Sequence, residues 1–96
     1  MTEKHRFKVL KVIVQKDVTE QEYPTVEKYF RVRARKYYIR DRYDNKDYVI
    51  IKTTPSWKDT ELCFVDPSGD ELYINEPELK DLLLGFIIDW TEENRR

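Results

Sequence analysis

The stretch that decides the fold is residues 28–40, which read KYFRVRARKYYIR. Because side chains alternate between the two faces of a β-strand, an extended backbone places Phe30, Val32 and Ala34 on one face. The opposite face then carries a row of aromatic and basic side chains: Tyr29, Arg31, Arg33, Arg35 and Tyr37. The first face suits a hydrophobic core and the second suits solvent or an anionic partner. The stretch therefore predicts one strand of an antiparallel sheet with one covered face.

Four further segments have the composition of strands, being rich in β-branched and aromatic residues and bounded by turn residues. With the arginine-bearing strand, the predicted strands span about residues 7–15, 27–40, 48–54, 60–65 and 71–74. In the first strand the apolar alternation slips between Val9 and Leu10, which indicates a β-bulge or burial on both faces. Asp66-Pro67-Ser68-Gly69 has the residues of a type I turn and joins the last two strands as a hairpin.

The final element is predicted to be a helix over about residues 76–93. Asn75 is the expected N-cap, Glu78 completes a capping box, and Pro77 is tolerated in the first turn. Apolar residues at helical spacing form one stripe: Leu79, Leu82, Leu83, Phe86, Ile87 and Trp90. Leu84 and Ile88 form an i, i+4 pair outside this stripe.

Together these elements predict a single α+β domain over residues 1–96, with the order β-β-β-β-β-α. The expected architecture is a curved five-stranded antiparallel sheet, in one variant partly barrel-like, with the C-terminal helix packed on it. A β-sandwich or a small barrel capped by the helix is the alternative.

The residues that usually carry catalysis are scarce. The chain has one histidine, His5, near its N-terminus, and one cysteine, Cys63, inside an apolar run that favours a buried thiol. No phosphate-binding or nucleophile-elbow motif is present. A metal-dependent hydrolase using Asp66, Asp70 and Glu78 is the weakest hypothesis, because turn and cap chemistry already account for Asp66 and Glu78. We therefore predict a non-enzyme with no catalytic residues, cofactor, metal or small-molecule substrate.

A cytoplasmic protein is expected, because there is no possible internal disulfide, no signal-peptide pattern and no stretch of membrane-spanning length. The net charge is −1, but residues 1–43 hold 12 Lys and Arg against 6 Asp and Glu, whereas residues 44–96 hold 6 against 13. This asymmetry predicts a basic and an acidic pole if the two halves separate in space.

The basic strand face is a candidate surface for nucleic acid or another anionic partner, because alternate arginines stand about 6.8 Å apart, close to two phosphate steps. Its predicted contact residues are Tyr29, Arg31, Arg33, Arg35, Tyr37 and Arg40. The competing interpretation is a solvated sheet face whose arginines pair with carboxylates on neighbouring strands. The pI of about 5.9 favours that interpretation, because nucleic-acid-binding domains usually exceed about 9.

A second candidate surface consists of Leu84 and Ile88, with Trp57 as a possible anchor in a turn-rich segment. The alternative is that Trp57 is a lid on the core, and that residues 16–25 or the segment around Trp57 cover this side of the helix. The leading functional hypothesis is a small protein-binding module: an inhibitor, an accessory subunit or a self-associating homodimer. Nucleic-acid binding through Arg31, Arg33 and Arg35 is the alternative.

Overall fold

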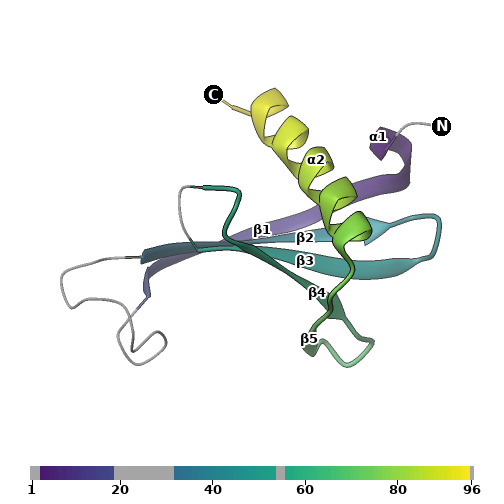
Figure 1. Cartoon of the computed structure of the whole chain (residues 1–96), viewed down its shortest axis with the longest axis horizontal. Helices are drawn as coiled ribbons and strands as arrows, with labels where there is room; N and C mark the ends of the chain where they lie inside the picture. The colour runs from purple at the N-terminus through teal and green to yellow at the C-terminus, as the bar shows by residue number, and fades with distance from the viewer. Residues whose placement is uncertain (1–2, 19–31, 54–55, 96) are drawn as a thin grey trace.

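The fold is a five-stranded antiparallel sheet with one long helix across one face (Figure 1). The computed structural model describes residues 3–18, 32–53 and 56–95, with side chains for residues 5–14, 35–53 and 56–95. Its elements are α1 (Glu3–Arg6), β1 (Phe7–Val18), β2 (Val32–Asp41), β3 (Lys46–Lys52), β4 (Thr60–Val65), β5 (Glu71–Tyr73) and α2 (Pro77–Glu93). Each strand pairs with the next in the chain, so the sheet is a meander in the order β1-β2-β3-β4-β5. The predicted α+β class is confirmed. The sheet is curved but does not close, so the partly barrel-like variant is only partly correct.

The predicted bulge in the first strand is present. The β1–β2 register shifts between Val9 and Lys11, so Leu10 is the extra residue. The shift keeps Val9 and Val12 on the same face of the sheet, opposite Ile39 and Tyr37. The strand boundaries differ modestly from those predicted, and residues 27–31 lie outside the described part of the chain.

The core lies between α2 and the sheet face beneath it. Alternate residues of β1 to β4 point toward α2, as the two-residue period of a strand requires. The buried cluster is Phe7, Tyr37, Ile39, Tyr48, Ile50, Leu62, Leu83 and Ile87. Ring contacts extend it, with Phe7 and Phe86 centroids 5.6 Å apart.

The start of α2 differs from the predicted capping box. The N-cap is Glu76 rather than Asn75, and no side chain caps the helix. Pro77 occupies the first turn, where its missing N–H is not needed, and Glu78 places a negative charge near the helix N-terminus. The short helix α1 was not predicted.

The hairpin turn at 66–69 is confirmed. The Gly69 N–H donates to the Asp66 carbonyl at 2.9 Å, and Gly69 has a φ of +93°, which glycine adopts without strain. The Asp66 carboxylate accepts the Ser68 hydroxyl at 2.6 Å and the Asp70 N–H at 2.9 Å. These bonds, that of Ser68 first, hold the pKa of Asp66 below its ordinary value.

The sheet face away from α2, here called the open face, is curled. Glu71 of β5 accepts hydrogen bonds from Lys36 Nζ at 3.1 Å and from the Tyr38 hydroxyl at 2.6 Å, both on β2. Strands β3 and β4 lie between them, and a flat sheet would separate β2 from β5 by about 14 Å. The curl buries Cys63, as predicted, and burial raises the pKa of its thiol.

Candidate functional site

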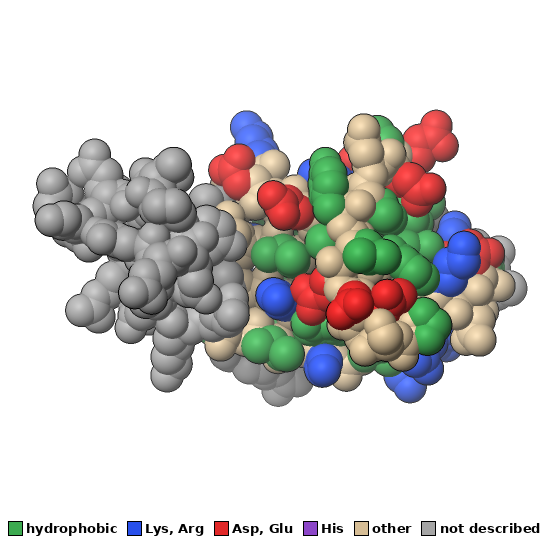
Figure 2. All heavy atoms as spheres, turned by 90° about the horizontal axis from the view of Figure 1, so that it is seen from below, with side chains coloured by type: hydrophobic (Ala, Val, Ile, Leu, Met, Phe, Trp, Pro, Cys, Tyr) green, Lys and Arg blue, Asp and Glu red, His purple; other side chains and the backbone are tan. Residues whose placement is uncertain are grey.

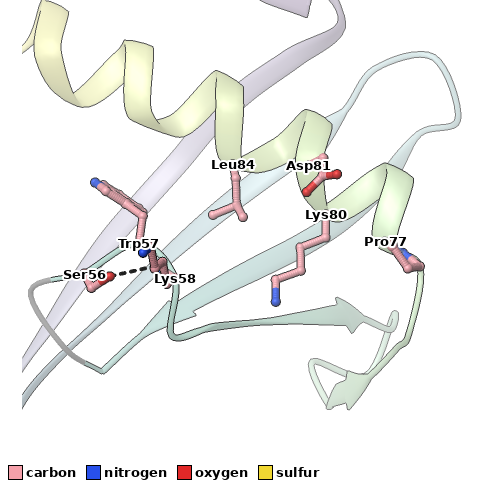
Figure 3. A pocket seen from close by; sticks show the side chains of 7 residues that line it. All are labelled: Ser56, Trp57, Lys58, Pro77, Lys80, Asp81 and Leu84. Atoms are coloured by element: carbon pink, nitrogen blue, oxygen red, sulfur yellow. Dashed lines mark hydrogen bonds between the residues drawn. The ribbon is translucent and has the colours of Figure 1, made fainter.

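A groove of about 680 Å³ lies between the N-terminal half of α2 and the segment that follows β3 (Figure 3). Its lining residues are Ser56, Trp57, Lys58, Pro77, Lys80, Asp81 and Leu84. Trp57 and Leu84, two of the three residues predicted from sequence as a protein interface, therefore meet in one groove.

Local hydrogen bonds fix one wall of the groove. The Lys58 N–H donates to the Ser56 hydroxyl at 3.1 Å, and the Thr60 hydroxyl donates to the Trp57 carbonyl at 3.2 Å. Trp57 is half-buried, with its ring 5.5 Å from that of Tyr37. Trp57 is therefore a lid on the core, as the alternative interpretation held, and its remaining surface faces the groove.

The other wall is one side of α2. Lys80 and Leu84 are four residues apart and so lie on the same side of the helix; in Figure 3 both project toward the 56–58 segment. Leu84 is half-buried and packs against the core, so placing it outside the apolar stripe of the helix was wrong. Ile88, one turn further along, is half-buried and is not among the described residues that line the groove.

Basic side chains lie near the Trp57 ring and on the groove lining. Lys52 Nζ lies 4.0 Å from the centroid of the Trp57 ring, and Lys52 is paired with Arg35 across β2 and β3. Burial, and then the positive charge of Arg35, lower the pKa of Lys52. Lys58 and Lys80 are on the groove lining, as is the carboxylate of Asp81. Lys52 adjoins the lining through its contact with Trp57, and Arg35 adjoins Lys52. The surroundings therefore favour an anionic ligand.

The predicted row of exposed cations is only partly present. Tyr37 is 2% exposed and belongs to the core, so its predicted exposure is wrong: its strand face is the one that α2 covers. Arg40 lies on the open face, where its guanidinium Nε is 2.9 Å from Asp47 Oδ1. Arg35 is exposed as expected, the side chain of Arg33 is not described, and Tyr29 and Arg31 lie outside the described residues.

Viewed from the side opposite α2, the surface mixes both charge signs with hydrophobic side chains (Figure 2). On the described part of this face, Arg40 is paired with Asp47 and Lys36 with Glu71. This agrees with the interpretation of a solvated sheet face whose cations are balanced across the strands.

Sequence reasoning missed Lys58 and Lys80 as groove residues, and Lys52 as the cation over the Trp57 ring. Two signals were available: Lys58 adjoins Trp57, and Lys80 precedes Leu84 by one helical turn. The position of Lys52 over the indole depends on how the chain turns after β3, which no local pattern specifies.

Three further findings concern metal ions, membranes and known proteins. Within the described ranges, no group of three or more His, Cys, Asp or Glu side chains is placed to hold a metal ion. None of the helices described has the length and apolar composition needed to cross a membrane. Comparisons with family models, curated proteins and solved structures find no match to this chain.

Proposed function

We propose that this chain is a non-enzymatic protein-binding module whose groove between Trp57 and Leu84 takes an acidic segment of a partner protein. The observation that carries the proposal is the meeting of these two apolar side chains from distant parts of the chain, with Lys58 and Lys80 on the same lining and Lys52 over the Trp57 ring. A large apolar side chain of the partner would occupy the groove, and flanking carboxylates would face Lys58 and Lys80.

The two kinds of contact contribute differently. Burying one large aliphatic side chain of the partner is worth about 1.5–3 kcal/mol, which supplies affinity. The exposed cations add less affinity, but they speed the encounter and select against basic partners. Such a site is expected to give weak to moderate binding that falls as salt rises.

The test is a peptide-display selection on the intact chain, because a random peptide library samples partner sequences of every charge and size. We expect the selected peptides to share one large apolar residue flanked by Asp or Glu. Leu84→Ser and Lys80→Glu should each weaken binding of a selected peptide about tenfold, or about 1.4 kcal/mol. The matched control is Leu82→Ser, which changes an exposed leucine of the same helix.

Two results would contradict the proposal. One is a set of selected peptides without acidic residues. The other is full binding to the Leu84→Ser variant when circular dichroism shows that it is folded.

A second candidate function is binding of single-stranded nucleic acid, favoured by Arg35 and Lys52. These two cations are neighbours, and no described carboxylate forms an ion pair with either of them. Binding would then weaken with salt by about 0.7 logarithmic units per phosphate contacted, and Arg35→Ala would reduce that slope. Absence of binding to oligonucleotides at low salt would eliminate this candidate.

A further inference from the structure

The outer edge of β1 is a second surface, distinct from the groove. Within the described residues β1 pairs with β2 on one side and with no strand on the other. An unpaired edge presents backbone N–H and C=O groups that only another extended chain satisfies in series. A ligand that pairs with this edge would therefore be an extended polypeptide segment.

Exposed apolar side chains are concentrated on this strand. Leu10 is 38% exposed, Ile13 38% and Val14 46%, so one strand holds three of the seven exposed large hydrophobic residues described. Edge strands are usually protected by lysines and bulges. In β1, Lys8, Lys11 and the bulge at Leu10 lie before Val12, and Lys16 and a second register shift, between Gln15 and Val18, lie after Val14. The three residues between them, Val12, Ile13 and Val14, include neither kind of protection.

The two faces of β1 differ in charge. Lys8, Lys11 and Ile13 lie opposite Arg40, Tyr38 and Lys36, so they belong to the open face. On the other face lie Val9, Val12 and Val14. A complementary strand thus has acidic residues on the open face, toward Lys8 and Lys11, and β-branched residues on the face toward α2.

We infer that β1 binds an extended segment of another protein by strand addition, and that this segment alternates acidic with β-branched apolar residues. A second copy of the chain fits less well. Antiparallel pairing of two β1 edges about Val12 would bring both Lys11 side chains onto one face, and residues 7–14 supply no carboxylate to balance them. Charge complementarity therefore favours an acidic partner strand over self-association.

The experiment compares two peptides, one alternating glutamate with valine and one alternating lysine with valine, by titration against the intact chain. We expect the glutamate peptide to bind at least tenfold more tightly. It should also slow amide hydrogen exchange in residues 12–14 and leave β5 unaffected. Ile13→Lys, which places a charge on the edge, should abolish binding. The matched control is Leu72→Lys, which changes an exposed apolar residue of β5, the strand at the opposite edge of the sheet. This variant should bind the glutamate peptide as tightly as the unmutated chain does.

Circular dichroism and thermal melting show whether each variant is folded. If Ile13→Lys does not fold, Val14→Lys provides a second edge variant. Equal affinity for the two peptides would overturn the inference. So would unchanged binding by a folded edge variant, or sedimentation of the unmutated chain as a dimer that Ile13→Lys dissociates.

Discussion

Arg6 and Asp41 form the most buried ion pair among the described residues. The guanidinium Nη2 lies 2.9 Å from Asp41 Oδ2, and the carboxylate side chain is 0% exposed. Asp41 also accepts the Tyr43 N–H at 3.0 Å, so its charge is satisfied from two directions. The pair joins the last residue of α1, directly before β1, to the end of β2, and the sheet register places Phe7 opposite Asp41.

Removing the cation leaves a buried carboxylate without its partner. We expect Arg6→Ala to lower the free energy of unfolding by about 3 kcal/mol, the low end for a broken buried pair, because Arg6 itself is 25% exposed. Urea denaturation measures the change. Arg42→Ala, at an exposed position nearby, should change stability by less than about 0.5 kcal/mol. Similar losses in the two variants would contradict the role given to the Arg6–Asp41 pair.

The same carboxylate makes stability depend on pH. Burial opposes ionisation of Asp41, but the hydrogen bonds from Arg6 and Tyr43 outweigh it, so its pKa lies below the ordinary 3.8. The pKa of Glu71 is also lowered from 4.5, because hydrogen bonds from Tyr38 and Lys36 outweigh burial. Both groups bind protons more readily in the unfolded chain, so stability is full above about pH 5 and falls as the pH drops below 4. Urea titrations from pH 3 to 7 should show this decline, with a shallower slope in Asp41→Asn.

At the scale of elements, helical periodicity predicted the centre of the buried side of α2 but not its edges. The stripe correctly included Leu83 and Ile87, both 0% exposed. Leu82 and Leu84 lie about 100° to either side of Leu83, so spacing alone does not say which of them is covered. The 56–58 segment lies beside Leu84, and Leu82 remains 37% exposed.

Adjacent leucines therefore have different energetic roles. Leu83→Ala should lower the free energy of unfolding by about 2–5 kcal/mol, because it opens a cavity against the sheet. Leu82→Ala should cost less than about 1 kcal/mol, because a third of that side chain already contacts water. Thermal and urea unfolding of the two variants compare them directly. Equal losses would mean that the helix packs with a different face toward the sheet.

In strand β2, the alternation of side chains predicted the strand but not which of its two faces is covered. Alternation was predicted correctly, but Tyr37 was assigned to the exposed face, because the prediction gave the core face to Phe30, Val32 and Ala34. Ile39 shares its face with Tyr37 and was a signal for the opposite choice. The covered face is selected by where α2 crosses the sheet, a long-range contact that the period of two does not encode.

At the scale of the whole molecule, the curl of the sheet could not be predicted from any one segment. It places Glu71, on a strand of three residues, within hydrogen-bond distance of Lys36 and Tyr38 on β2. On the same face Val49, which pairs with Tyr38 and Cys63 on the neighbouring strands, is 0% exposed although no helix of the described chain packs there. The curled sheet thus has a second buried region on its open face, smaller than the core between α2 and the sheet.

The ionisation of Tyr38 reports on this curl. Burial, and then the hydrogen bond to Glu71, raise its pKa from 10.0 to about 12, so its neutral form stabilises the fold below pH 10 and that contribution is lost as the pH rises toward 12. In Glu71→Gln the negative charge is gone but burial remains, so we expect the pKa of Tyr38 to fall while staying above 10. Ultraviolet titration of tyrosinate, with Tyr38→Phe to identify the signal, measures the pKa. Glu61→Gln is the control, because Glu61 lies on the open face of β4 and is not bonded to Tyr38. A Tyr38 pKa near 10 in the unmutated chain would mean that β5 does not fold across the open face toward β2.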